Sequence, residues 1–349
     1  MRRKKMNNGI STIENGQAPL HTRRATLRLA AVAAAMLITT QMAWAQNNGS
    51  SLVIKGKDGW LFAGWGSLTQ VDTAGIDRTV QLVAHVNQQL KERNIDLLIL
   101  MLPDKVHFYA DKLPDGTKVS PAVEQRYALI QNKLQRADIQ TFDNFTLLKK
   151  VRGAGADVFY RTDQHWTLDA ADATAQGTAD LIRKIKPQLS GTAGTGTPLG
   201  ALAKERRYGD LAEIFLTPEE KKQIGREVYT VRRQAEGQGL LDDAPAPVHV
   251  TGHSMVQPYF GYPQKLSNLL DRPVSLNWKP GNIGPWVMLL EYLESSSFKQ
   301  TKPQVLVWQM FEPNFNQGPD AAGLWDNAAV MPVDTWTQRV TRALGSSTP

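Results

Sequence analysis

The fold class is decided by the stretch Asp96-Leu97-Leu98-Ile99-Leu100-Met101-Leu102, which Pro103 ends. A continuous apolar run of this length, without polar alternation, is typical of a parallel strand buried on both faces. The segment before it, residues 72–93, has apolar side chains at steps of three and four residues, as an amphipathic helix does. These side chains are Ile76, Val80, Val83, Val86 and Leu90. A helix that leads into a buried strand predicts an α/β fold.

Strand-length apolar runs and helical segments alternate along the rest of the chain, which predicts a layered α/β fold with a mostly parallel central sheet. Further strands are expected at 139–142, 158–160, 228–231, 248–251 and 305–310. Further helices are expected at 121–136, 168–185, 259–270, 286–293 and 333–344. Residues 187–207, which are rich in glycine, are expected to form a flexible surface loop within a single domain that spans residues 46–349.

The composition excludes several kinds of site. The 349-residue chain is 42% apolar, enough for a sizeable core, and it has no cysteine. Disulfides, thiolate metal sites and a cysteine nucleophile are therefore excluded, so covalent catalysis must use oxygen or nitrogen. The six histidines do not form the HExxH spacing of a helical zinc site, so no metal is predicted. His85 and His107 have no evident partner in the sequence and are interpreted as structural.

The net charge of +7 comes almost entirely from the first residues. Residues 1–45 hold seven Lys and Arg against Glu14 alone, which is +6, so subtraction leaves +1 for the rest of the chain. The basic isoelectric point therefore describes this leader, and no nucleic-acid partner is indicated. Farther along, Glu205-Arg206-Arg207 is interpreted as solvated surface, with contact to an anionic polymer as the alternative.

Residues 1–45 have the order of a signal peptide: basic residues, the apolar run 29–40, and Ala43-Trp44-Ala45 as a small-x-small cleavage pattern. We therefore expect export to the periplasm. The general secretory route and, because Arg23-Arg24 precedes the apolar run, the twin-arginine route both fit. An uncleaved inner-membrane anchor is the alternative, although the run is shorter than the roughly 18 residues that a membrane-spanning helix needs.

The motif Gly252-His253-Ser254 places a serine directly after the expected strand 248–251. Open α/β sheets bind their ligands at the carboxyl ends of strands, so Ser254 is a candidate nucleophile. Gly252 would let the backbone turn sharply, and the N–H groups of a helix after the serine would face a developing oxyanion. The alternative is that Ser254 only caps the following helix.

The motif Asp163-Gln164-His165-Trp166-Thr167 offers a carboxylate and an imidazole two residues apart. In extended backbone such residues point the same way, so Asp163 and His165 would meet a common partner. The carboxylate would fix the tautomer of the imidazole and stabilise the imidazolium that forms when His165 takes a proton. The alternative is that Asp163 caps helix 168–185 while His165 packs beside Trp166. The residues alone leave both interpretations open.

Six stretches, in register, resemble the alginate O-acetyltransferase family of the AlgJ/AlgX type. They are Lys55-Gly56-Lys57-Asp58-Gly59-Trp60-Leu61-Phe62, Pro103-Asp104-Lys105 with Leu113-Pro114, Arg161-Thr162-Asp163-Gln164-His165-Trp166-Thr167, Gly252-His253-Ser254, Gly284-Pro285-Trp286 and Leu306-Val307-Trp308. The Asp-x-His-Trp block is the most specific of them. The family is similar to SGNH hydrolases, so the resemblance implies an SGNH-hydrolase-like three-layer fold. The aspartate and the histidine precede the nucleophile in the family's permuted order, as they do here.

The resemblance also implies a catalytic triad and no cofactor. Carried over residue by residue, Ser254 is the nucleophile, His165 is the general base and acid, and Asp163 is the orienting carboxylate. One departure lies beside the nucleophile, where the family usually has threonine or aspartate and this chain has His253. That histidine would either perturb Ser254 or face away from it.

Substrate-binding residues follow less directly from the motifs. The tyrosine that the family places shortly after the serine is Tyr259 or Tyr262, and with Gly252 it is a candidate for binding the oxyanion. Aromatic residues near the motifs would offer apolar platforms to sugar rings. These are Tyr160, Trp166, Tyr259 and Trp286. Core packing is the alternative for each, and for Trp286 it is the favoured interpretation.

The function that the resemblance implies is that of a periplasmic O-acetyltransferase acting on an exopolysaccharide, such as alginate or cellulose. An acetyl-serine at Ser254 would pass its acetyl group to a sugar hydroxyl. A membrane-bound O-acyltransferase would supply the acetyl group, and the chain would associate peripherally with a membrane biosynthetic complex. Two alternatives remain: a polysaccharide acetyl esterase with the same triad, and a non-catalytic polysaccharide-binding scaffold subunit.

Overall fold

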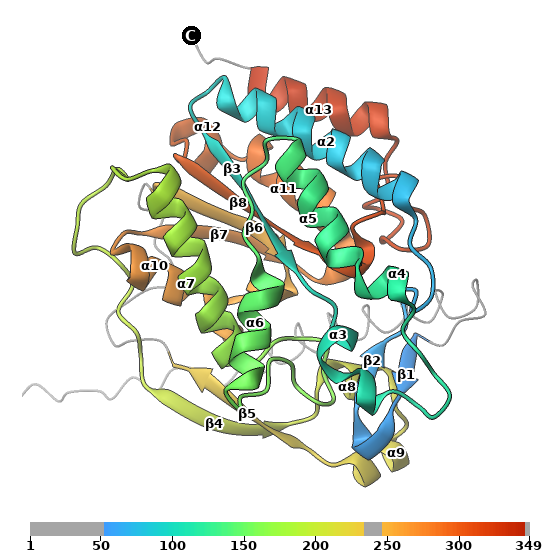
Figure 1. Cartoon of the computed structure of the whole chain (residues 1–349). Coiled ribbons are helices and arrows are strands. Elements are labelled where there is room, and N and C mark those ends of the chain that lie inside the picture. Colours follow the sequence, from blue (N-terminus) through green and yellow to red (C-terminus); the bar gives the residue numbers. More distant parts are fainter. Residues whose placement is uncertain (1–51, 234–245, 346–349) are drawn as a thin grey trace, which may run out of the picture. The chain divides into compact units, whose positions relative to one another are not determined.

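The computed structural model describes residues 52–233 and 246–345 (Figure 1). The predicted signal peptide, residues 1–45, lies outside the described residues. None of the helices in the two described ranges combines the length and the apolar character that crossing a bilayer requires.

Four parallel strands form the central sheet. In spatial order they are β3 (Asp96–Leu102), β8 (Val305–Phe311), β6 (Val248–His253) and β7 (Val274–Lys279). β3, β6 and β8 are buried along almost their whole length, in keeping with the nearly uninterrupted apolar sequences of β3 and β8, whereas β6 also buries His249, Thr251 and His253. The predicted α/β fold with a parallel central sheet is confirmed. β7 is missing from the predicted strands because it lies at the sheet edge and carries polar, part-exposed residues.

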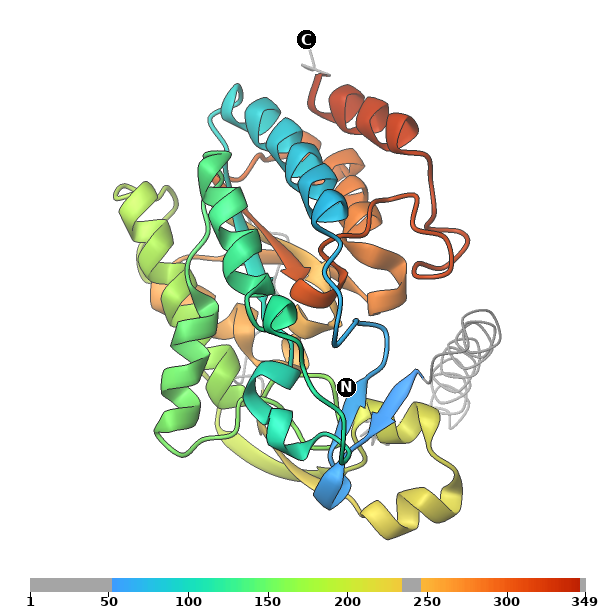
Figure 2. The same cartoon turned by 45° about the vertical axis from the view of Figure 1, so that its right-hand side comes forward.

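Helices cover both faces of this sheet, because alternate strand residues point to opposite sides. Leu98 and Leu100 of β3 belong to one hydrophobic core, whereas Leu97 and Ile99 belong to another. The first core is covered by α6 (Asn144–Gly153), α7 (Leu168–Ile185) and α10 (Tyr262–Leu270). The second is covered by α2 (Thr73–Lys91), α5 (Arg126–Arg136), α11 (Gly284–Glu294) and α13 (Val333–Gly345). α13 lies beside α2 in both views (Figure 1, Figure 2), and the three predicted layers are confirmed.

Two of the predicted helices are divided. The helix expected at 121–136 is α4 (Pro121–Glu124) followed by α5. The helix expected at 259–270 is a 3-10 turn, Pro258–Phe260, followed by α10. Gly261 stands between them with φ +82°, a left-handed conformation that a right-handed helix cannot include.

Two of the predicted strands, 139–142 and 158–160, do not form. Each segment makes only an isolated bridge: Gln140 pairs with Leu98, and Phe159 pairs with Trp166. A strand needs a partner along its whole length, and these short apolar segments have a partner at one residue each.

Several short elements surround the sheet. β1 (Val53–Lys55) and β2 (Leu61–Ala63) pair around a 3-10 turn, Lys57–Gly59. The remaining short elements are α3 (Val106–Tyr109), α12 (Ser296–Gln300) and the 3-10 turns Ala110–Lys112, Ser254–Val256, Gly281–Ile283 and Glu312–Asn314.

A separate antiparallel pair consists of β4 (Leu202–Arg207) and β5 (Glu227–Arg232), with α8 (Asp210–Phe215) and α9 (Pro218–Ile224) between them. We call this segment, residues 202–232, the β4–β5 insertion. The flexible loop expected at 187–207 is therefore wrong over its last six residues, which form β4. The charged sequence of β4 gives no local strand signal, and its extended structure depends on pairing with β5 beyond the two helices.

Candidate catalytic site

Ser254 is the first residue after β6, at the carboxyl edge of the central sheet. Its Oγ lies 2.8 Å from Nε2 of His165. The element that begins at Ser254 is a three-residue 3-10 turn, and α10 begins only at Tyr262. The helix expected at 259–270 therefore does not follow the serine directly, and the Ser254 side chain contacts His165 instead of capping a helix.

Gly252 lies within β6 and packs against β8. A Cβ atom at this position would lie 2.7 Å from Oε1 and 2.8 Å from Cβ of Gln309, closer than real Cβ contacts come. The same Oε1 accepts a hydrogen bond from the backbone N–H of His253 at 3.1 Å. Close packing, and not the sharp turn that was predicted, explains the glycine.

Asp163 and His165 lie in the turn that precedes α7, and neither side chain is exposed to solvent (0%). Nδ1 of His165 lies 2.7 Å from Oδ1 of Asp163, and the backbone N–H of His165 donates to the same oxygen at 3.0 Å. The two side chains meet because the backbone turns, so the expected extended backbone is wrong. The carboxylate accepts from the residue two positions on, as aspartate commonly does in turns.

The imidazole of His165 is thus held between a carboxylate and a hydroxyl. Burial lowers the pKa of His165, but the charge of Asp163 and its hydrogen bond outweigh burial and raise the pKa above its ordinary value. The ring of Phe260 stacks on the imidazole with the ring centroids 4.6 Å apart. With Nδ1–H donated to Asp163, Nε2 is free to accept the proton of Ser254.

The second carboxylate oxygen of Asp163 accepts a hydrogen bond from a buried tyrosine. The hydroxyl of Tyr229, on β5, donates to Oδ2 at 2.8 Å. Burial raises the pKa of Asp163, but the charge and hydrogen bond of His165 and the hydrogen bond of Tyr229 outweigh burial and hold the pKa below its usual range. Asp163 therefore stays a carboxylate beside His165.

A buried lysine fixes the backbone around Asp163. The ammonium of Lys105 donates to the carbonyl oxygens of Leu61, Tyr160, Arg161 and Asp163 at 2.7 to 3.0 Å. Burial lowers the pKa of Lys105 to about 7, and the charges of Glu227 and Asp163 oppose that change. One side chain thus links β2 to the turn that carries Asp163.

Glu227, the first residue of β5, holds the same turn from another side. Its carboxylate accepts hydrogen bonds from the backbone N–H groups of Arg161 and Thr162, both at 2.8 Å, and from the hydroxyl of Thr162. Glu227 and Tyr229 together attach the β4–β5 insertion to the turn that carries Asp163 and His165.

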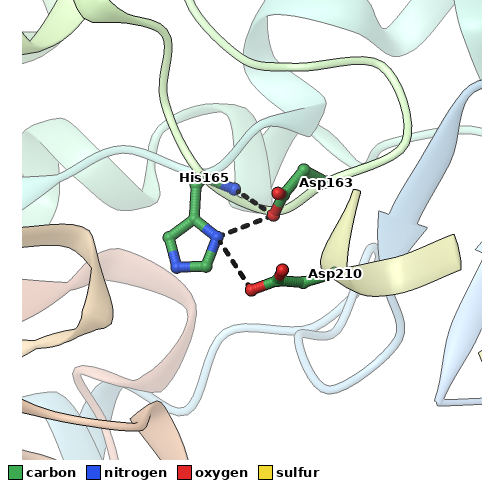
Figure 3. A group of neighbouring side chains, drawn as sticks. All are labelled: Asp163, His165 and Asp210. Carbon is green, nitrogen blue, oxygen red and sulfur yellow. Dashed lines mark hydrogen bonds and ion pairs between the residues drawn. The ribbon is translucent and has the colours of Figure 1, made fainter. Parts of the chain in front are cut away.

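A second acidic side chain approaches His165. Oδ2 of Asp210, the first residue of α8, lies 3.3 Å from Nδ1 of His165, on the same side of the ring as Asp163 (Figure 3). Atoms of Asp163, His165 and Asp210 lie within 4.8 Å of one another, so these three residues could offer ligands to a metal ion. In the structure they contact one another through Nδ1, and the absence of a catalytic metal remains a prediction.

The aromatic platforms expected at Tyr160 and Trp166 are wrong, because the side chains are buried, and the core packing favoured for Trp286 is confirmed. Trp166 is 0% and Tyr160 is 6% exposed, and Tyr160 stacks on Tyr229 with a centroid distance of 3.8 Å. Trp286 packs edge-on against Trp308 in the core. None of the three presents a ring face to a sugar.

Of the two tyrosines expected after the serine, Tyr262 is fully buried and contacts the hydroxyl of Thr178. Tyr259 is half-buried, and its hydroxyl donates to Glu205 at 3.1 Å. The Arg207 guanidinium lies 5.2 Å from the Tyr259 ring centroid. Arg207 is therefore part of the surroundings of the site, so its interpretation as plain solvated surface is wrong.

The His253 side chain contacts β8 and has no hydrogen bond to the nucleophile. Its Nε2 lies 3.1 Å from Nε2 of Gln309, and its ring meets Phe311 edge-on. Burial, with a smaller contribution from the charge of His165, lowers the pKa of His253 to about 3. His253 is thus a neutral core residue at neutral pH.

Sequence reasoning missed the residues that surround Asp163 and His165. These are Lys105, Asp210, Glu227 and Tyr229. Lys105 stands in the quoted stretch Pro103-Asp104-Lys105, where a lysine after a buried strand was a signal for a buried charge. The others lie in the β4–β5 insertion, where no motif marks them.

The comparisons agree with this architecture. The family model described as "SGNH hydrolase-like domain, acetyltransferase AlgX" matches residues 53–312. A probable alginate O-acetylase AlgJ of Pseudomonas fluorescens is 27% identical over 297 residues, which cover 80% of this chain and 73% of that protein. The protein of the same name from Pseudomonas aeruginosa is 27% identical over 279 residues, covering 74% and 69%.

Among solved structures, the O-acetyltransferase domain of Pseudomonas putida AlgJ has the same fold. The TM-score is 0.66 at 24% sequence identity, over 83% of this chain and 99% of that domain. The match of the family model covers most of the chain, including Asp163, His165 and Ser254. The chain therefore belongs to the family of SGNH hydrolase-like acetyltransferases that is represented by AlgX.

Proposed function

We propose that this chain transfers acetyl groups to hydroxyls of an exopolysaccharide through an acetyl ester of Ser254. The observation that carries the proposal is the continuous contact from Asp163 through His165 to Ser254, at 2.7 and 2.8 Å, within a chain of an acetyltransferase family. The acceptor class follows from relatives named as alginate O-acetylases.

In the first half-reaction, Nε2 of His165 takes the proton of Ser254 while Oγ attacks the carbonyl carbon of the acetyl donor. The bond to the donor's leaving group breaks, and that group takes the proton from His165. Asp163 stabilises the imidazolium in between, since its carboxylate faces Nδ1 at 2.7 Å. The product is an acetyl ester on Ser254.

In the second half-reaction, a sugar hydroxyl gives its proton to Nε2 of His165 and attacks the acetyl ester. The ester bond to Oγ breaks, and Ser254 recovers its proton from His165. Transfer prevails over hydrolysis when the sugar is held close to the ester in attacking geometry. The half-buried Tyr259 and Arg207, beside the site, are the side chains that we propose contact the acceptor.

The cellular setting is part of the proposal. The N-terminal leader supports export to the periplasm, where exopolysaccharide is modified, and the acetyl group would then have to be supplied through the membrane. We propose a membrane-bound O-acyltransferase as the donor and a peripheral association with its complex.

The test measures acetyl transfer from a model acetyl ester to an oligosaccharide by mass spectrometry. The wild-type chain should form acetylated oligosaccharide, and brief exposure to the ester without acceptor should add one acetyl group to Ser254. Ser254→Ala should lose both, whereas Ser190→Ala, at an exposed serine, should keep both.

Other outcomes decide between the alternatives. Free acetate alone, even at high acceptor concentration, would establish an acetyl esterase. Unchanged acetylation of the polymer in cells that carry Ser254→Ala would establish a non-catalytic scaffold subunit.

A further inference from the structure

Besides Asp163, a charged pair from the β4–β5 insertion lies near His165, and its members are Asp210 and Arg207. Asp210 places Oδ2 3.3 Å from Nδ1 of His165 (Figure 3). Its other oxygen, Oδ1, accepts a hydrogen bond from Nη2 of Arg207 at 2.8 Å. Arg207 is held in turn over the ring of Tyr229, with 4.9 Å between its guanidinium carbon and the ring centroid. The carboxylate is thus fixed toward the imidazole and not left to rotate in solvent.

The backbone before Asp210 is shaped for this approach. Gly209 lies so close to the turn that a Cβ atom there would lie 2.4 Å from the carbonyl carbon and oxygen of Thr162. Its N–H donates to the hydroxyl of Thr162 at 3.1 Å. Only glycine permits this approach, which brings the first residue of α8 against the turn that carries His165.

We propose that Asp210, oriented by Arg207, is a positioning residue that acts as a second carboxylate partner of the His165 imidazolium. The inference rests on the proposed function, in which His165 gains and loses a proton in each half-reaction. Asp163 is the closer acceptor of Nδ1–H at 2.7 Å, so Asp210 adds negative charge without replacing that hydrogen bond.

The charges around the imidazole have opposing effects. The groups that face it or its carboxylate are Asp163 from its own turn, Ser254 and His253 from the end of β6, Asp210 from α8, Arg207 from β4, Tyr229 and Glu227 from β5, and Lys105 after β3. Asp210 raises the pKa of His165, and Arg207 lowers it. Burial and the charge of Asp163 raise the pKa of Asp210 itself. The Asp210–Arg207 pair therefore adjusts the basicity of His165 from outside the triad.

The decisive measurement is the titration of His165, followed by NMR of the imidazole nitrogens in the full chain. The chain has six histidines, and the His165 signal is the one that His165→Gln removes. Asp210→Asn should lower the midpoint of His165 by about 1 pH unit, and Arg207→Gln should raise it. The acid limb of model-ester hydrolysis should move in the same directions, which a merely structural role would not produce.

Asp172→Asn is the matched control, because it removes a carboxylate that pairs with Arg232 at 2.7 Å instead of with His165. An unmoved midpoint in Asp210→Asn, equal to that of Asp172→Asn and the wild type, overturns the proposal. If Asp210→Asn does not fold, Asp210→Ser, which removes the same charge, decides: a lowered midpoint supports the proposal, and an unchanged or raised one overturns it. The titration does not depend on acetyl transfer, so an unmoved midpoint refutes only the role of Asp210. The proposed function is refuted by a different result, namely that Ser254→Ala still transfers acetyl groups.

Discussion

Tyr229→Phe tests whether the hydrogen bond from β5 keeps Asp163 ionised. The substitution removes one hydroxyl oxygen and leaves the ring stacked on Tyr160, so packing is preserved. The lost bond, 2.8 Å from hydroxyl to Oδ2, ends on a buried charged group. A hydrogen bond to a charged group contributes about 1.5 to 3 kcal/mol, so the free energy of unfolding should fall by about 2 kcal/mol at neutral pH.

The loss should also depend on pH with a definite sign. The pKa of Asp163 is lowered in the folded chain, so its contribution to stability is complete above the unfolded value of about 3.9 and is lost as pH falls from there through the lower folded pKa. The unfolded chains of wild type and Tyr229→Phe titrate alike, so the gap between their free energies of unfolding should hold down to about pH 4 and should narrow only at lower pH, as pH falls through the folded pKa of Asp163 in the variant.

Tyr160→Phe provides the matched control for this experiment. The two rings stack on each other, but the hydroxyl of Tyr160 donates to a neutral acceptor, the carbonyl oxygen of Thr230, at 3.3 Å. Its loss should cost about 1 kcal/mol or less and should not follow the titration of Asp163. Urea denaturation of all three chains at about pH 7 and at about pH 2.5, well below the unfolded pKa of Asp163, measures both effects. Equal losses for the two variants at both pH values would refute the reasoning.

Three further predictions concern buried groups around the site. Lys105→Met leaves four carbonyl oxygens without their donor and should lower the free energy of unfolding by about 3 kcal/mol near pH 6; denaturation that matches the wild type contradicts this. Burial lowers the pKa of His107, but its hydrogen bond and ion pair with Glu312 raise the pKa above the usual value. The contribution of this pair to stability is therefore complete below about pH 6.5 and is lost as pH rises through the folded pKa of His107. The stability gap between wild type and His107→Gln should therefore shrink from about pH 5.5 to about pH 8.5, and a gap that widens opposes the assignment. Gly209→Ala must displace α8 from Thr162 and should reduce ester hydrolysis by roughly tenfold, since even small displacements of catalytic groups are costly, with circular dichroism as the control for folding.

The sequence predicts those elements of the fold whose structure depends on residues close together in the chain. β3 and β8 are nearly uninterrupted apolar runs. α7 has both its apolar spacing and the cap of Thr167 within one segment, so its bounds are those expected. β4 and the single bridge at Gln140 depend on partners far along the chain, and local pattern carries no record of such a partner.

The same division holds for the site. Asp163, His165 and Ser254 stand in short motifs, and the structure brings them together. The hydrogen bonds of Asp163 to Tyr229 and the approach of Asp210 arise from the β4–β5 insertion, whose charged sequence resembles any solvated surface. For the aromatic residues beside the motifs the sequence predicts a role that the structure does not give them. Trp166 follows His165 directly, but its side chain is buried in the core.

The β4–β5 insertion lies outside the central sheet, although it clamps the turn that carries Asp163 through Glu227 and Tyr229. Elements with few core contacts open more readily than the sheet that they border. Activity should therefore disappear on warming before the sheet unfolds, and amide hydrogens of β5 should exchange sooner than those of β8. Heat inactivation of this chain would then measure the detachment of the β4–β5 insertion from the turn of Asp163, while the central sheet is still folded.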